Sequence, residues 1–309
     1  MNGKPLAILG DYAWDVLIRT NTELLQGGDT YGEVLLTPGG SAANVAVWAQ
    51  RCGLPTRFVG KIGRDRFGEL AQRELAHEGV DSYLVETDAQ RTGSVAVFID
   101  HSGERSMISG RGADHYLLPS ELPRAELEAT CHLHLTAWSF FTDPPRAAAR
   151  EAAKIAAGAG ATLSLDPGSF QLIGEMGVES FLDVTTDLGI DLLLPNREEG
   201  NVLTGLEEPA AICRKLAEQY GANVILKLDA EGSQVYWEGE CFHIPPATDR
   251  LVDATGAGDS FAGAFLAAWL SGRGVRESAG YATRVSAWTI QRLGARPPLD
   301  GTLDLTIGE

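Results

Sequence analysis

Cysteine is scarce in this sequence, and long apolar runs are absent. The chain has 4 Cys among 309 residues, and they form no Cys-x-x-Cys pair: Cys52, Cys131, Cys213 and Cys241. Because a disulfide framework or a cysteine metal site needs closer spacing, we expect free, mostly buried thiols in a reducing compartment. No apolar run approaches a membrane span and no signal-peptide pattern precedes Pro5, so we expect a cytoplasmic protein without membrane contact.

Positively charged residues are also few. The 25 Lys and Arg stand against 42 Asp and Glu, which gives a formal net charge of -17. No basic run occurs, and this charge would repel a nucleic-acid backbone, so we expect no nucleic-acid partner. Two motifs of other enzyme classes are missing as well: the P-loop G-x-x-x-x-G-K-S/T and the hydrolase elbow G-x-S-x-G. A small anionic substrate stays compatible with the acidic chain, because backbone N–H groups and a metal ion act locally.

Short apolar runs alternate with helical patterns along most of the chain. The predicted strands are 6–9, 57–60, 95–99, 132–135, 162–165, 192–194 and 224–228. Helical patterns cover 41–52, 67–77 and an Ala-rich stretch that ends near 158. This alternation favours an α/β fold with a doubly wound, mostly parallel sheet flanked by helices.

Two hairpins interrupt the alternation. Residues 14–20 and 31–36 flank a Gly27-Gly28-Asp29 turn, and residues 94–99 and 106–109 flank Ser102-Gly103-Glu104. We expect one domain over 1–309 with a small β-rich appendage at about 14–37 and 92–110. A third hairpin is predicted at 234–237 and 241–244.

The most informative stretch is Asp253-Ala254-Thr255-Gly256-Ala257-Gly258-Asp259, followed by an apolar run to Leu270 that predicts a buried helix. Free N–H groups at a helix start bind anions, and glycine lets an anion come close. A carboxylate beside such a site suits a base that takes a proton from a hydroxyl attacking a phosphoryl group. Taken alone, Gly-x-Gly and a following Asp are also common structural features of helix starts.

Several other polar residues fall where predicted strands end. Ligands of open α/β sheets bind at this edge. The residues concerned are Asp11 and Asp15, Asp166, Asn196, Lys227 and Asp229. Two short motifs accompany them. Gly39-Gly40 precedes a helix start with Ser41 as the expected N-cap and Asn44 in the first turn, and Asn196 with Glu199 shares one side of a helix.

Four motifs resemble those of the ribokinase-like (PfkB) carbohydrate kinases, in family order from Leu6 to about Pro297. Asp253 to Phe261 resembles D-T/A-x-G-A-G-D-x-F, and Gly39 to Asn44 resembles G-G-x-x-x-N. Asn196 to Glu199 resembles N-x-x-E, which implies Mg²⁺ held through water. Lys227 to Gly232 resembles K-x-G-x-x-G, with Asp229 in place of the first glycine.

The resemblance implies a role for each of these residues. Gly256, Ala257 and Gly258 would form an anion hole beside the general base Asp259. Sugar-binding residues would be Asp15, Gly39, Gly40 and Asn44. Nucleotide-binding residues would be Asn196, Lys227, Asp229, Gly232, Thr255 and Gly258. Mg²⁺ would bind through water at Asn196 and Glu199, and a monovalent cation such as K⁺ at Asp253 and Thr255. The two hairpins would form a lid and the contact of a homodimer.

We therefore predict an enzyme that phosphorylates a primary hydroxyl of a small sugar with ATP, with a neutral monosaccharide preferred. Two alternatives stay open. A nucleoside kinase of the same superfamily would stack its base on Trp14, Trp138 or Phe140, and a sugar-binding regulator would keep the fold without catalysis. Cys131, His132 and His134 predict a half-buried strand rather than a metal site, because alternate residues face opposite sides.

Overall fold

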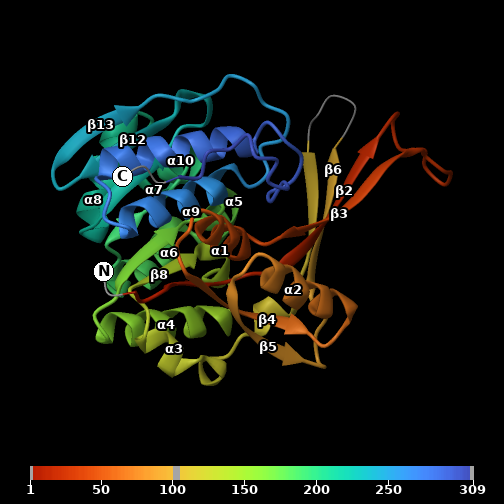
Figure 1. Cartoon of the computed structure of the whole chain (residues 1–309), viewed down its shortest axis with the longest axis horizontal. Helices are drawn as coiled ribbons and strands as arrows, with labels where there is room; N and C mark the ends of the chain where they lie inside the picture. Colours follow the sequence, from red (N-terminus) through yellow and green to blue (C-terminus); the bar gives the residue numbers. More distant parts are fainter. Residues whose placement is uncertain (1–2, 100–104, 307–309) are drawn as a thin grey trace.

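The main feature of the molecule is a large, mostly parallel sheet covered by helices on both faces (Figure 1). The computed structural model describes residues 3–99 and 105–306. Within these ranges the strand order is β13-β12-β11-β10-β9-β8-β1-β4-β5, parallel from β11 to β5, with an antiparallel β12–β13 hairpin. The bounds are β1 Leu6–Leu9, β4 Thr56–Gly63, β5 Asp81–Thr87, β8 His132–Thr136, β9 Thr162–Asp166, β10 Leu192–Leu193, β11 Asn223–Lys227, β12 Ser233–Trp237 and β13 Glu240–Ile244. The predicted doubly wound α/β fold is confirmed.

Alternate residues of the central strands enter two separate cores. In β1, Leu6 and Ile8 join the core under α1, α9 and α10, whereas Ala7 and Leu9 join the core under α4 and α8. This is the period-2 pattern of a sheet that is buried on both faces. The helices are α1 Ser41–Arg51, α2 Arg66–His77, α3 Arg124–Glu128, α4 Pro145–Gly158, α5 Phe170–Met176, α6 Val178–Thr185, α7 Arg197–Thr204, α8 Pro209–Tyr220, α9 Ala257–Leu270 and α10 Val275–Thr289.

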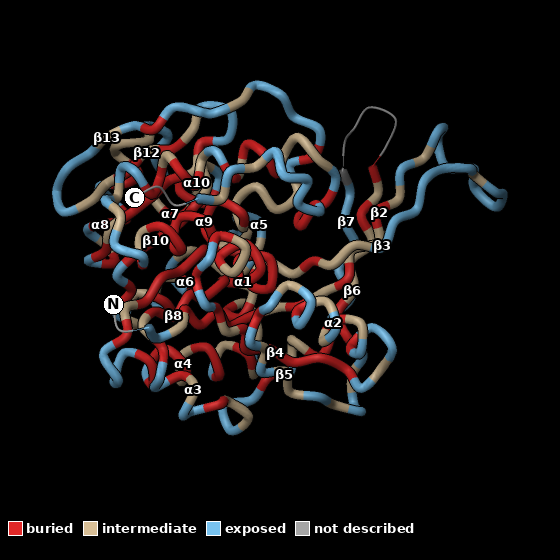
Figure 2. Tube along the Cα trace, in the orientation of Figure 1, coloured by how far each residue is buried: buried red, intermediate tan, exposed pale blue. Residues whose placement is uncertain are grey.

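The two predicted hairpins join into one four-stranded sheet that projects from the body (Figure 1). Its order is β3-β2-β6-β7, with β2 Ala13–Thr20, β3 Gly32–Gly39, β6 Gly93–Ile99 and β7 Arg105–Gly110. The central β2–β6 pair is parallel and the outer pairs are antiparallel. Figure 2 shows that much of this sheet is exposed, in contrast to the buried main sheet. The predicted Ser102-Gly103-Glu104 turn lies outside the described residues.

The structure corrects three expectations. The β8 strand is fully buried rather than half-buried, because β1 and β9 flank it and helices cover both of its faces. His132 and His134 share the Ser164 hydroxyl at 2.7 Å, and burial lowers the pKa of each to about 3. Helix α9 begins at Ala257, not Asp259. All four cysteines are free, but Cys241 is exposed and Cys131 is half-buried.

Candidate functional site

The carboxyl ends of adjacent parallel strands bring the predicted polar residues together at one rim. Asp166 is the last residue of β9, Lys227 is the last residue of β11, and Asn196 follows β10 and bridges to Lys227. Asp11 follows β1 and lies close enough to Asp259 to influence the pKa of its carboxyl. The rim expected from the sequence is therefore present.

The Gly256–Gly258 turn begins helix α9 in a conformation that requires glycine at its first position. Gly256 is the N-cap of α9 with a φ of 74°, and a Cβ there would lie 2.6 Å from the Cα of Ala295. Both facts require glycine. The turn is half-buried, so it is not closed off from solvent. The Ala257 N–H donates to the Ala254 carbonyl over 3.2 Å, whereas the Gly258 N–H has no backbone acceptor within the described ranges.

Asp259 lies in the first turn of α9 and faces Asn44. The Asn44 amide donates to Asp259 Oδ2 at 2.7 Å. Burial raises the pKa of the Asp259 carboxyl to about 7, the Asn44 hydrogen bond opposes this shift, and the charge of Asp166 adds to it. A carboxyl that titrates near neutral pH is suited to accept a proton from an alcohol. The sequence did not predict the direct contact between Asp259 and Asn44.

Lys227 is the cation of the site. Its ammonium donates to Asp166 Oδ2 at 2.6 Å, and its Nζ would lie 3.1 Å from a Cβ placed on Gly258. Burial would lower the pKa of Lys227, but the charges of Asp166 and Glu199 outweigh it and hold that pKa above its ordinary value. A charged ammonium beside the Gly258 turn can attract an anion.

Asn196 and Glu199 form a reciprocal cap at the start of α7. The Asn196 side chain accepts from the Glu199 N–H at 2.8 Å, and the Glu199 carboxylate accepts from both the backbone and the amide of Asn196. Burial, followed by the charge of Asp166, raises the pKa of Glu199. No group of three or more His, Cys, Asp or Glu in the described part of the chain could hold a metal directly. Mg²⁺ fits here only as an ion that keeps most of its waters.

Asp229 occupies a backbone conformation that usually requires glycine. Its φ is 51°, in the left-handed region that Asp and Asn tolerate better than other side chains. The substitution for the motif glycine therefore leaves the turn intact. Gly232 closes the turn with a φ of 89°, and a Cβ there would lie 2.1 Å from the Ile244 carbonyl.

The Gly39–Asn44 motif, here named the acceptor motif after the role expected for it, lies at the junction of the two sheets. A Cβ on Gly39 would lie 2.4 Å from Asp15 Oδ2, so this carboxylate rests against the glycine backbone. Burial raises the pKa of Asp15 to about 6, with Arg296 opposing the shift. The predicted N-cap Ser41 is wrong, because Gly40 is the N-cap and Asp11 accepts the Ser41 N–H at 2.8 Å.

Asp253 and Thr255 tie the loop before α9 to the end of the chain. Asp253 Oδ1 accepts from the Thr255 N–H and hydroxyl, and Oδ2 accepts from the Gly294 N–H at 2.9 Å. Asp253 thus joins the start of α9 to the irregular segment after α10.

Sequence reasoning missed Arg296 and Glu74. The Arg296 side chain is 1% exposed, and its guanidinium donates to Asn44 Oδ1 and Glu74 Oε2, each at 2.7 Å. No periodicity or motif marks Arg296, which follows Gly294 and Ala295 in an irregular segment. Only its contacts connect it to the site.

The aromatic residues proposed for base stacking are mostly unavailable. Phe140 is fully buried, and Trp14 is 6% exposed with its indole N–H donating to the Phe67 carbonyl. Trp138 is half-buried beside Phe141. Of these three residues, Trp138 is the one that is not buried.

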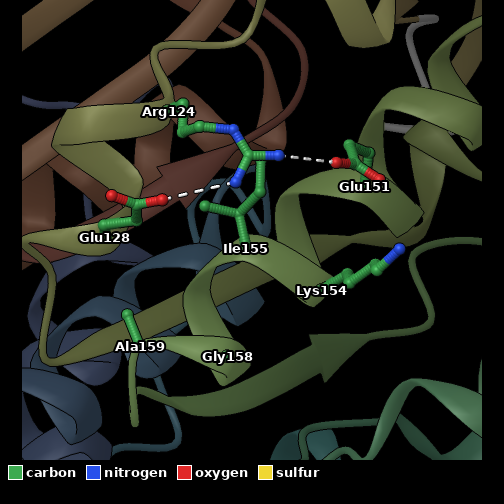
Figure 3. A pocket seen from close by; sticks show the side chains of 7 residues that line it. All are labelled: Arg124, Glu128, Glu151, Lys154, Ile155, Gly158 and Ala159. Carbon is green, nitrogen blue, oxygen red and sulfur yellow. Dashed lines mark hydrogen bonds and ion pairs between the residues drawn. The ribbon is translucent and has the colours of Figure 1, made fainter.

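A separate groove of about 340 Å³ lies between α3 and α4 (Figure 3). Arg124 pairs there with Glu128 and Glu151, and the groove contains none of the predicted site residues. Charged side chains that neutralise one another give it no evident chemistry.

Comparison with known proteins shows the family of this chain. Residues 8–301 match the model of the pfkB family of carbohydrate kinases, so the chain belongs to that family and is an ATP-dependent sugar kinase. It is 31% identical over 273 residues to a fructokinase of Klebsiella pneumoniae, covering 86% of this chain and 84% of that protein. It is 30% identical over 294 residues to an ATP-dependent ribose-1-phosphate kinase of Halopiger xanaduensis, covering 93% and 92%.

Solved structures share the fold. The adenosine kinase of Sinorhizobium meliloti superposes with a TM-score of 0.86 at 23% identity, covering 96% of this chain and 97% of that one. The Arabidopsis thaliana ribokinase complexed with ribose and ATP superposes with a TM-score of 0.79 at 25% identity, covering 94% of each chain. Within the described ranges, no helix is long and apolar enough to cross a membrane.

Proposed function

We propose that this chain transfers the γ-phosphoryl group of ATP to a primary hydroxyl of a small neutral sugar, with Asp259 as the general base. The supporting observation is the placement of Asp259: half-buried, next to the Gly256–Gly258 turn, and hydrogen-bonded to Asn44 of the acceptor motif. The arrangement joins an anion site, a base and polyol-binding groups at one rim.

In the proposed reaction, Asp15 and Asn44 hold the acceptor while Asp259 takes the proton of its hydroxyl. The alcohol oxygen forms a bond to the γ-phosphorus as the bond from that phosphorus to the bridging oxygen of ADP breaks. Amides of Gly256–Gly258 and the ammonium of Lys227 stabilise the charge on the transferred group. Bound Mg²⁺, held through water near Asn196 and Glu199, would neutralise phosphate charge.

The charge at the acceptor end supports a neutral sugar over a phosphorylated one. Asp11 and Asp253 both raise the pKa of Asp15, so carboxylates gather where the acceptor would bind. The nearby cation Arg296 is already paired with Glu74. A phosphate on the acceptor would meet net negative charge there. The ribose-1-phosphate kinase among the relatives makes this a question for a direct assay.

The assay measures ADP formation with a matched panel: fructose, ribose, ribose 1-phosphate and adenosine. We expect turnover with a neutral sugar and little with ribose 1-phosphate. Turnover with adenosine alone would favour the nucleoside kinase, and sugar binding in a calorimeter without ADP formation would favour a regulator. Asp229 and Gly232 are proposed to line the nucleotide side, together with Thr255.

A cation and a lid complete the proposal. The buried Asp253 carboxylate would attract a monovalent cation beside Thr255, and exchange of K⁺ for a bulky organic cation would then lower turnover. The four-stranded sheet, at about 14–37 and 92–110 of a single 1–309 kinase domain, would close over the sugar and exclude water.

The same four-stranded sheet would hold together a cytoplasmic homodimer. Apolar side chains on both edge strands are exposed: Leu36 at 46%, Met107 at 57% and Ile108 at 66%. Exposed apolar groups of this kind mark protein contacts. Light scattering should give a dimer mass that Ile108→Glu reduces to that of a monomer.

A further inference from the structure

The segment after Gly294 lies along helix α1 and is bonded to it at three successive residues. Ala295 and Pro297 offer carbonyls to α1 side chains, and Arg296 offers its guanidinium. The bonds join Ala295 O to Trp48 Nε1 at 2.9 Å, Arg296 Nε to Asn44 Oδ1 at 2.7 Å, and Pro297 O to Arg51 Nη1 at 3.0 Å. A segment near the end of the chain is thereby held against the acceptor motif.

The Arg296 guanidinium connects three separate elements. Besides Asn44, it donates through Nη2 to the Gly39 carbonyl at 2.8 Å and through Nη1 to Glu74 Oε2 at 2.7 Å. The three N–H groups point in different directions from one planar guanidinium. A lysine ammonium on a flexible stem cannot reproduce this arrangement. Arg296 therefore holds Gly39, Asn44 and Glu74 in one arrangement.

This contact determines which way the Asn44 amide points. Its carbonyl oxygen accepts from Arg296, so its NH₂ group points to Asp259 Oδ2 at 2.7 Å. A flipped amide would direct an oxygen at the Asp259 carboxylate and donors at the guanidinium, and both contacts would be repulsive. The arginine thus excludes the unproductive orientation.

We infer that Arg296 is a positioning residue of the phosphoryl transfer: it aims the amide of Asn44 at the base Asp259 and couples the acceptor motif to it. The inference rests on the proposed role of Asp259. Arg296 does not itself touch the reacting atoms, because Asn44 lies between the guanidinium and the base.

Loss of the amide donor would change the pH at which the base works. The charged groups that face Asp259 are Asp166 from β9, Lys227 from β11 and Asp11 after β1. Among its neighbours, Asn44 supplies the hydrogen bond that favours the ionised carboxylate. Without it, a larger fraction of Asp259 is protonated at neutral pH, and kcat is regained only at higher pH.

The test is Arg296→Lys, assayed for kcat at saturating sugar between about pH 6 and 9. The lysine keeps the positive charge near Asp15, so a change in kcat at saturating sugar reports on the base Asp259. We expect kcat about 10-fold lower near pH 7, recovering to within about 3-fold of wild type near pH 9. The matched control is Arg51→Lys, which loosens the same segment at Pro297 and should leave the pH profile unchanged.

Each outcome has a definite reading. A folded Arg296→Lys protein whose pH profile matches wild type, or whose kcat falls equally at every pH, overturns the inference. If the single variant does not fold, Arg296→Met with Glu74→Gln removes both charges of the ion pair together, and a kcat profile at saturating sugar that matches wild type again overturns the inference. A wild-type protein that forms no ADP with any acceptor overturns the proposed function instead.

Discussion

The substitution Asp259→Asn tests whether the buried Asp259 carboxylate destabilises the folded protein while it serves catalysis. Burial raises the folded-state pKa from 3.8 to about 7, a difference of about 3 units. At ~1.4 kcal/mol per unit, the ionised form costs the folded protein at most roughly 4 kcal/mol. The new amide must find acceptors for its own N–H groups, so the expected net gain is about 2 kcal/mol, or roughly 4 °C in melting temperature near pH 8.

The pH dependence of the gain follows from the direction of the shift. A carboxyl whose folded pKa is raised contributes stability below its unfolded pKa and loses that contribution as the pH rises through the folded value. The variant should therefore match wild type near about pH 4 and exceed it most from about pH 7 upward. Turnover should fall by roughly two to four decades while ATP and sugar still bind.

Calorimetry and a coupled ADP assay measure the two effects on the same preparation. Asp249→Asn, at an exposed carboxyl, is the control for loss of one negative charge. Turnover close to wild type would remove Asp259 from the role of base. A gain in melting temperature that is equal at every pH would contradict the burial of this carboxylate.

Three further substitutions address other parts of the site. Lys227→Met leaves Asp166 without its partner and should cost roughly 3–5 kcal/mol in unfolding free energy and raise the KM for ATP at least about 10-fold, whereas unchanged values would refute its place beside the phosphates. Gly256→Ala brings a Cβ within 2.6 Å of Ala295 and should cost about 1–3 kcal/mol, checked by denaturant unfolding. Asn44→Ala should weaken sugar binding with ATP affinity unchanged in calorimetry, and the reverse pattern would exchange the two subsites.

Local signals in the sequence predicted the rim, the helix-start motifs and all three hairpins. Apolar alternation and glycine-rich turns act over a few residues, so they can be detected without tertiary context. The edge strand β5 was missed because its half-exposed residues Asp81–Thr87 lack a continuous apolar run. The first two hairpins were expected in one appendage, but the parallel β2–β6 pairing that joins them was not predicted, since strand pairing over long separations leaves no periodic pattern in the sequence.

No local pattern in the sequence indicates the contacts that complete the site. Asp11 caps α1 from 30 residues away, in place of the adjacent Ser41. Arg296 reaches Asn44 over 252 residues. Such contacts depend on which strand ends lie side by side in the sheet and on where the segment after α10 packs. No short stretch of the sequence specifies either arrangement.

Burial makes the ionised carboxylates at the rim energetically costly, and this cost is suited to the proposed chemistry. The pKa values of Asp15, Glu199 and Asp259 are all raised, chiefly by burial, and Lys227 pairs with Asp166 rather than with any of these three. Full solvation of the rim would relieve this cost but would leave Asp259 a weak base with a pKa near 3.8. Because burial raises the pKa to about 7 instead, Asp259 is a stronger base that is still partly ionised near neutral pH. If the proposed closure excludes water from the sugar, it would raise the pKa of Asp259 further, so the proton affinity of the base should increase as the acceptor hydroxyl arrives.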